Sequence, residues 1–138
     1  MQEIKDVILA RAKALEGGDA AAVQAYHADE VVSFSLAPPL GGAEPGRDPQ
    51  PLQAWIDKFD APPRREVTDL TVTADGDVAF ATSLDAMTAS MAGDGFTMWY
   101  RVTLGLRRID GRWLVTHEHT SVPFYMDGSF RAATDLKP

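Results

Sequence analysis

Two histidines and a serine alternate near the end of the chain, in the stretch THEHTSVPF at residues 116–124. Histidine is the side chain whose ordinary pKa lies closest to neutral pH, so a histidine pair can accept and donate protons in catalysis. A His-x-His pair on a strand can also supply two ligands to a metal ion. A third interpretation is structural, because buried polar side chains are normally held by hydrogen bonds. The residues alone leave these three interpretations open.

The turn signal Asp110-Gly111 predicts how this stretch pairs with the strand before it. A two-residue hairpin turn at this point pairs Ile109 with Arg112 and, continued without interruption, pairs Tyr100 with Ser121. One face of the resulting hairpin is mostly apolar, and we expect the helices to cover it. The residues of the histidine row and their neighbours on that face are His117, His119, Ser121, Tyr100 and Val102.

This register predicts that the row lines a cavity for an organic ligand. His117 and His119 would then serve as an acid–base pair, and Tyr100, Val102 and Ser121 as ligand contacts. We expect no metal, because the only other histidine, His27, lies at a predicted helix end and no third ligand is evident. No cofactor is expected either.

The opposite face of the hairpin carries polar and amphipathic side chains. Trp99, Arg101 and Glu118 lie there in the predicted register, with Arg101 and Glu118 as diagonal neighbours. An outward tryptophan on a wide sheet face indicates a covered surface. We therefore expect a homodimer that forms through this face.

Hydrophobic periodicity predicts helices in the first part of the chain and strands in the second. The expected helices are 4–15, 19–28 and 52–59, and the expected strands are 31–36, 65–74, 78–91, 96–109 and 112–122. The proline- and glycine-rich residues 37–51 are expected to form a loop. Helices followed by antiparallel strands are typical of an α+β domain.

Length and charge restrict the class of protein. The chain has 138 residues, which is enough for one domain with a sizeable core. Its net charge of −7 argues against a nucleic-acid partner. Cysteine is absent, and no apolar run is long enough to span a membrane. We expect a single cytoplasmic domain over 1–138, with a core at 3–126 and a tail at 127–138, that binds neither nucleic acid nor membrane.

The segments ALEGGDAAAVQAYHADEVV and DGRWLVTHEHTSVPF, separated by a tryptophan-bearing helix, resemble the SnoaL-like (ketosteroid isomerase-like) branch of the nuclear transport factor two-like (NTF2-like) superfamily. The resemblance implies a cone-shaped fold, in which three N-terminal helices pack on a curved antiparallel sheet and enclose a pocket. It also implies that Tyr26, Trp55 and Phe59 line this pocket. The Trp-xxx-His-x-His-x-Ser spacing is similar to that of the association domain of calcium/calmodulin-dependent protein kinase.

The chain departs from the steroid isomerases of this family at their catalytic positions. Ala12 and Ser35 stand near the places of the family's tyrosine and aspartate, and neither can do that chemistry. Asp85 is the one carboxylate in the middle of a strand that we nominate, and the sequence does not fix its face.

The expected function is that of a small-molecule-binding pocket protein. One form of it is an acid–base enzyme of the isomerase, cyclase or dehydratase class that acts on a small apolar carbonyl compound. The alternative is a non-catalytic ligand-binding or oligomerisation module. Whether the chain is an enzyme stays open.

Overall fold

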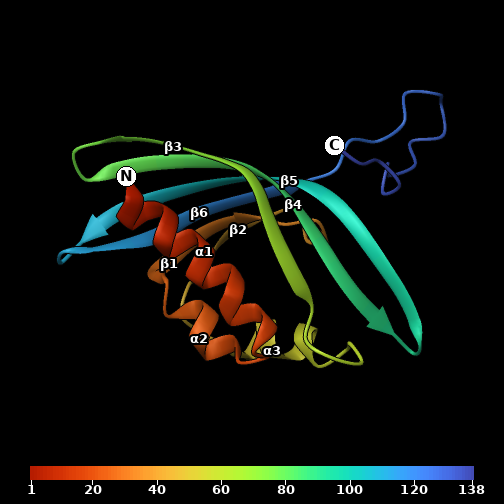
Figure 1. The fold of residues 1–138 in the computed structure, drawn as a ribbon, viewed down its shortest axis with the longest axis horizontal. Helices are drawn as coiled ribbons and strands as arrows, with labels where there is room; N and C mark the ends of the chain where they lie inside the picture. Colours follow the sequence, from red (N-terminus) through yellow and green to blue (C-terminus); the bar gives the residue numbers. More distant parts are fainter.

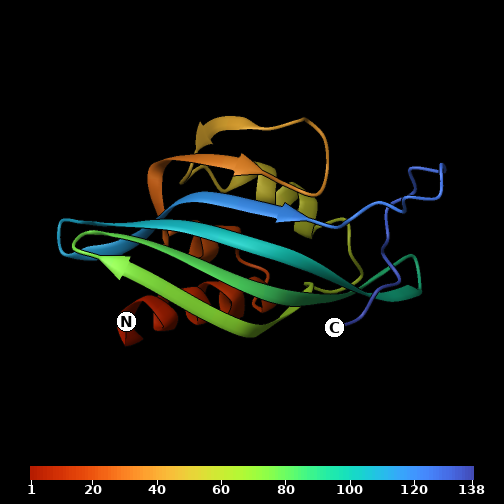
Figure 2. The same cartoon turned by 90° about the horizontal axis from the view of Figure 1, so that it is seen from above.

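The computed structural model describes all residues 1–138 as one α+β fold. Three helices precede most of the sheet and lie against its concave side, while the long strands arch over them (Figures 1 and 2). The helices are α1 (Gln2–Glu16), α2 (Ala20–Gln24) and α3 (Gln50–Ile56). The strands are β1 (His27–Phe34), β2 (Gly42–Pro45), β3 (Arg64–Asp75), β4 (Val78–Met91), β5 (Asp94–Ile109) and β6 (Arg112–Ser121).

The six strands form a single curved sheet in the order β2-β1-β6-β5-β4-β3. All neighbouring strands are antiparallel except β1 and β6, which are parallel. The predicted fold class is therefore confirmed. No helix begins after β3, as the change of hydrophobic period near residue 65 predicts.

The core lies between α1 and the inner face of the sheet. Ile4 and Ile8, one turn apart on α1, are 1% and 4% exposed and pack in one cluster with Leu104 and Val115 of the sheet. Burying side chains of this size contributes about 1.5–3 kcal/mol each. Asp19 caps α2, because its carboxylate accepts a hydrogen bond from the backbone N–H of Ala21 at 3.0 Å.

The first half of the chain differs from the sequence-based prediction at two places. Helix α2 ends at Gln24, so that His27 begins β1 instead of ending a helix. Residues 42–45, expected in a loop, form β2, which pairs with β1 as an edge strand. A short edge strand tolerates glycine and proline because only one of its sides is hydrogen-bonded.

A β-bulge in β6 changes the register of the last hairpin. Ile109 pairs with Arg112, as predicted, and the register continues to Leu106 opposite Val115. Gly105 then pairs with His117, which leaves Thr116 as an extra residue. Side chains after Thr116 therefore point to the opposite face from the one predicted.

Gly105 fits this irregularity because it has no side chain. A Cβ on Gly105 would lie 3.1 Å from the Cβ of His117, and the hydroxyl of Thr116 donates to the carbonyl oxygen of Gly105 at 3.3 Å.

The residues after β6 form an arm that extends away from the body of the molecule (Figures 1 and 2). The arm folds back on itself through a bridge between Phe124 and Ala132. Phe124 and Phe130 contact each other at 5.5 Å between ring centres, yet Phe130 stays 74% exposed. None of the three helices is long and apolar enough to cross a membrane.

Candidate functional site

The bulge places the predicted histidine row on the outer face of the sheet. His117 contacts the backbone oxygen of Val32 on β1 through Nδ1 at 2.7 Å, and His119 packs against Phe34. Ser121 pairs with Arg101 and not with Tyr100. The predicted inward position of the row is therefore wrong, because one extra residue at Thr116 inverts the alternation of side chains.

The same inversion carries Glu118 to the inner face, away from the predicted surface with Trp99 and Arg101. Its Oε2 lies 2.6 Å from Nη2 of Arg11, as an ion pair without a well-aligned hydrogen bond. Burial alone would raise the pKa of Glu118, but the charges of Arg11 and Arg65 outweigh it and lower the pKa to about 2. Glu118 therefore remains an anion at neutral pH.

His27 contacts the arginine of this first ion pair. Arg11 donates from Nε to Nε2 of His27 at 2.8 Å, so the ring proton resides on Nδ1, which donates to the carbonyl oxygen of Gly46 at 2.9 Å. Burial lowers the pKa of His27 to about 4, and the Arg11 guanidinium adds to the effect. Both ring nitrogens are engaged, and the ring is neutral at pH 7.

A second ion pair links β3 and β4. Arg65 donates from Nε to Oδ2 of Asp85 at 2.6 Å, and Ser83 donates from its hydroxyl to Oδ1 of Asp85 at 2.6 Å. Asp85 is fully buried and pairs with Tyr100 across the sheet, which places it on the inner face. Burial would lower the pKa of Arg65, but the neighbouring acidic groups raise it above its ordinary value. Arg65 therefore stays charged.

Tyr100 lies beside the second ion pair, with its ring centre 5.7 Å from Cζ of Arg65. Burial raises the pKa of Tyr100 to about 12, despite the opposing charge of Arg65. The phenol therefore keeps its proton and can donate a hydrogen bond.

Arg65 and Tyr100 both retain unused donors. Neither the Tyr100 hydroxyl nor the terminal nitrogens of Arg65 form a hydrogen bond within the chain, and none of them is among the fully enclosed unpaired atoms. These donors therefore border space that a small molecule can reach.

Together these groups form an interior charge cluster, defined as Arg11, Arg65, Asp85, Glu118, His27 and Tyr100. Two arginines balance two carboxylates, so the cluster has no net charge. The side chains of Arg65 and Glu118 remain 12% and 18% exposed although they lie on the inner face. The helices thus leave part of this face open.

Aromatic side chains of α3 and of the segment after it pack against the core that contains Tyr100. Trp55 and Phe59 pack edge to face at 4.9 Å between ring centres, and Phe59 contacts Phe96 of β5 at 6.5 Å. Trp55 also packs against the main core together with Met98 and Val122. Four of the predicted ligand contacts are in this region. Tyr100 and Val102 belong to the core, and Val102 is only 3% exposed. Trp55 packs against this core and Phe59 packs on Trp55. Tyr26 is half-buried in the turn that leads from α2 into β1.

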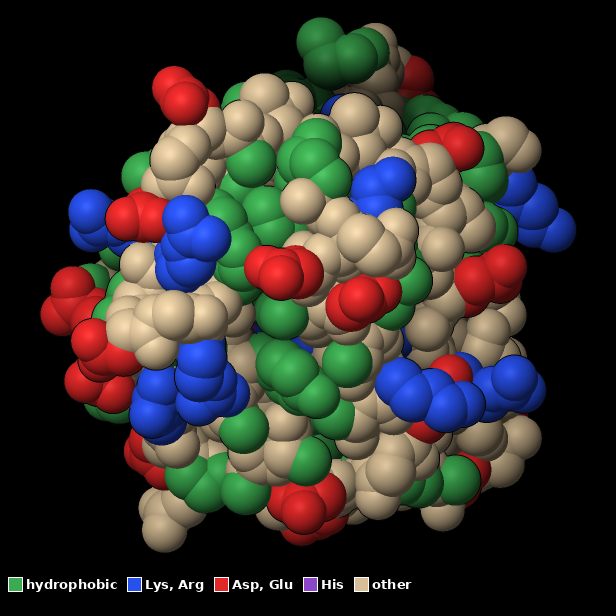
Figure 3. All heavy atoms as spheres, turned by 60° about the vertical axis from the view of Figure 1, so that its left-hand side comes forward, with side chains coloured by type: hydrophobic (Ala, Val, Ile, Leu, Met, Phe, Trp, Pro, Cys, Tyr) green, Lys and Arg blue, Asp and Glu red, His purple; other side chains and the backbone are tan.

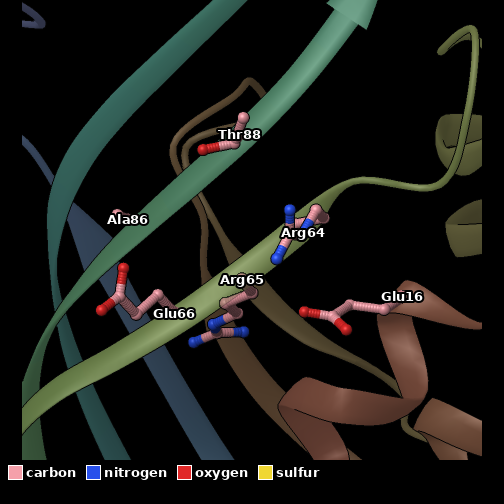
Figure 4. Close-up of a pocket in the computed structure, with 6 residues that line it drawn as sticks. All are labelled: Glu16, Arg64, Arg65, Glu66, Ala86 and Thr88. Atoms are coloured by element: carbon pink, nitrogen blue, oxygen red, sulfur yellow. The ribbon is translucent and has the colours of Figure 1, made fainter.

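A hollow of about 220 Å³ lies between the end of α1 and strands β3 and β4. Figure 4 shows Glu16 of α1 turned toward Arg64 and Arg65 of β3 across this hollow. Its remaining lining residues are Glu66, Ala86 and Thr88. The lining is mostly polar, and Arg65 is the residue that it shares with the interior charge cluster.

Charged side chains of both signs are interspersed around a small apolar area on the face drawn in Figure 3. This face therefore offers no extended surface of one sign for a polyanion. No group of three or more histidine, aspartate or glutamate side chains could hold a metal ion within one copy of the chain.

Sequence comparison defines the class of protein. The model of the SnoaL-like domain matches residues 4–125, and the chain belongs to this family. No curated protein matches the chain in sequence.

Solved structures agree with the family assignment. An NTF2-like protein of unknown function from Pseudomonas putida is 31% identical, with 99% of this chain and 95% of that chain covered and a TM-score of 0.87. A candidate calcium/calmodulin-dependent protein kinase II association domain from Xanthomonas campestris is 20% identical over 86% of this chain and 84% of that chain, with a TM-score of 0.73. A candidate scytalone dehydratase from Novosphingobium aromaticivorans is 14% identical over 97% of this chain and 91% of that chain, with a TM-score of 0.78. The last two show the likeness of fold alone.

Proposed function

We propose that the protein binds a small, neutral, mostly apolar organic molecule on the concave side of the sheet, through a carbonyl or similar acceptor oxygen. The observation that carries this proposal is that Tyr100 and Arg65, whose ring centre and Cζ are 5.7 Å apart on the inner face, both keep unused donors, the hydroxyl and the terminal nitrogens. Partly desolvated donors gain from a partner, so an acceptor oxygen that reaches either of them gains affinity.

The charge balance of the interior favours a neutral ligand over an anion. Arg65 is already neutralised by Asp85 at 2.6 Å, and Arg11 by Glu118 at 2.6 Å. A ligand carboxylate would add an unbalanced negative charge near two buried carboxylates, which is costly in a medium of low dielectric. A ketone, aldehyde or amide oxygen avoids that cost.

The aromatic side chains support an apolar ligand body. Trp55 and Met98 are partly buried against the core that contains Tyr100, and Phe59 packs on the ring of Trp55. Sites for small molecules are mostly apolar with a few well-placed polar groups. The distribution here has that character.

The cluster is better suited to polarising a carbonyl than to removing a proton. Glu118, with a pKa of about 2, is a weak base, and both nitrogens of His27 are engaged. His117 and His119 lie on the outer face, away from this ligand. If the bound molecule reacts, Tyr100 is the group that stabilises negative charge on its oxygen.

A homodimer through the outer face of the sheet is the second part of the proposal. The chain has 20 acidic residues, yet none occupies an outward position on β4, β5 or β6. Outward apolar side chains there include Phe80, which is 53% exposed, and half-buried Trp99. An acid-free face with exposed aromatics favours burial against a second copy.

Ligand-detected NMR with three matched probes tests the binding proposal: acetophenone, 1-phenylethanol and benzoate. We expect the ketone to bind most tightly, and Tyr100→Phe to weaken it about tenfold because a hydrogen bond in a partly desolvated site is lost. Tyr125→Phe, on the arm, is the matched control and should bind like the parent. Equal binding by Tyr100→Phe, or preference for benzoate, would contradict the proposal.

A further inference from the structure

A second hollow, of about 620 Å³, adjoins the polar hollow drawn in Figure 4. It is lined by residues 60–62 and Arg64 on one side, and by residues 88–90 and 95–97 of the β4–β5 hairpin on the other. Arg64 and Thr88 line both hollows, so the two meet at these residues. Together they form one groove that extends from Arg65 to Phe96.

The two ends of this groove differ in polarity. The first hollow contains two arginines and two glutamates, so its lining has no net charge. The second hollow exposes mostly apolar surface, and we call it the apolar hollow; its apolar side chains are Ala61, Pro62, Ala89 and Phe96. The hydroxyls of Thr88 and Thr97 at its edge are 2.9 Å apart and bind each other. The apolar hollow therefore offers contact area more than hydrogen bonds.

Hydrogen bonds from Asp60 hold the two walls of the apolar hollow together. The carboxylate of Asp60 accepts from the hydroxyl of Ser90 at 2.6 Å and from the backbone N–H groups of Ala92 and Gly93 at 3.1 and 3.0 Å. The backbone N–H of Asp60 donates to the carbonyl oxygen of Ser90 at 2.8 Å. These bonds tie the segment after α3 to the β4–β5 turn. The hollow is therefore formed in the free protein, and a ligand does not have to order its walls.

The pairing of the strands gives the length of the groove. Arg65 pairs with Met87 on β4, and Phe96 pairs with Ala89, two residues further along the same strand. Phe96 therefore lies two strands across and two residues along from Arg65. The spacings of strands and residues in a sheet place the two Cα atoms roughly 12 Å apart. A single small ring does not span this length, whereas an extended chain of about eight carbons does.

We propose that the ligand is elongated, with its carbonyl group at Arg65 and its apolar body in the apolar hollow against Phe96. The inference rests on the proposed function, in which an acceptor oxygen binds the free donors of Arg65 or Tyr100, and it adds the class of ligand. Ketones with a long unbranched chain have this shape. The balanced charges of the first hollow suit a neutral polar group, and the ring of Phe96, which is 39% exposed, offers contact to the chain.

Titration of the full chain with 2-butanone, 2-hexanone and 2-octanone, followed by ligand-detected NMR, tests the inference. We expect the affinity to rise about tenfold from 2-butanone to 2-octanone, because each added methylene leaves water against the wall of the hollow. Phe96→Ala should remove most of this gain and leave the binding of 2-butanone unchanged. Phe80→Ala makes the same truncation at an exposed position on the outer face, and this matched control should behave like the parent.

A second variant narrows the apolar hollow without removing a contact. A Cβ on Gly95 would meet nothing closer than the backbone oxygen of Ala89 at 3.9 Å, so the backbone accepts a side chain at this lining position. Gly95→Val should weaken the binding of 2-octanone and leave that of 2-butanone unchanged.

The chain-length series separates this inference from the proposed function. Equal affinity for the three ketones in the parent, or unchanged binding of 2-octanone in both Phe96→Ala and Gly95→Val, would overturn the elongated ligand. In either case, ketone binding that is weakened by Tyr100→Phe would leave the proposed function standing. If no ketone binds to the parent, both proposals fail.

Discussion

Acid should destabilise the fold through His27. The ring is held neutral by burial and by Arg11, so its pKa falls from 6.5 to about 4 on folding. The unfolded chain therefore binds the proton at higher pH than the folded chain, and stability is lost as the pH falls below the unfolded value. With these two values, lowering the pH from 7 to 5 removes about 1.8 kcal/mol of folding free energy.

Urea unfolding followed by tryptophan fluorescence at pH 7 and pH 5 measures this effect. We expect the midpoint to fall by about 1 M between the two values, for a typical urea dependence of this chain length. His27→Gln should be less stable at pH 7, because Arg11 and Gly46 lose their present partner, but should lose most of the pH dependence. His119→Gln, on the outer face, is the control and should keep it. A parent protein equally stable at both pH values, or an unchanged slope in His27→Gln, would refute the reasoning.

Two further predictions concern assembly and local stability. Trp99→Asp places a charge in the proposed dimer face, so we expect this variant to sediment as a monomer under conditions in which the parent is dimeric; a dimeric variant would contradict the proposed face. Asp19→Ala removes the cap of α2 and should lower the free energy of unfolding by about 1 kcal/mol in urea titrations, whereas a loss near zero would mean that solvent replaces the cap.

The sequence predicted the long hairpins well because their turns are explicit. Asp110-Gly111 predicted the pairing of Ile109 with Arg112, and the alternation of apolar and polar residues predicted the strands on either side of the turn. The predicted register was wrong beyond Leu106, because a bulge leaves one residue unpaired and the residue types of the two strands do not reveal it. Gly105, in the middle of a strand, was the available signal, because an interior glycine often marks a bulge.

The sequence did not reveal most of the interior charge cluster, because its members are distant from one another along the chain. Arg11 occupies the same helical stripe as Ile4 and Ile8, so its position already indicated a buried charge in need of a partner. Its partners are distant in sequence, and one of them, Glu118, was assigned to the wrong face. The orientation of Asp85 depended on which residues around Gly93 form the turn, and only the observed pairing with Tyr100 settles it.

The bulge at Thr116 decides which side chains of β6 reach each face of the sheet. If the strand kept Thr116 in regular register, opposite Gly105 and without a bulge, His117 and His119 would turn to the concave side and Glu118 would leave its contact with Arg11. Two chains of this fold can therefore share the letters His-x-His and still present them to opposite faces of the sheet, depending on whether the last strand contains a bulge. For relatives of this protein, the observed register of the last strand, and not the count of residues from its turn, must be known before a role is transferred to these histidines.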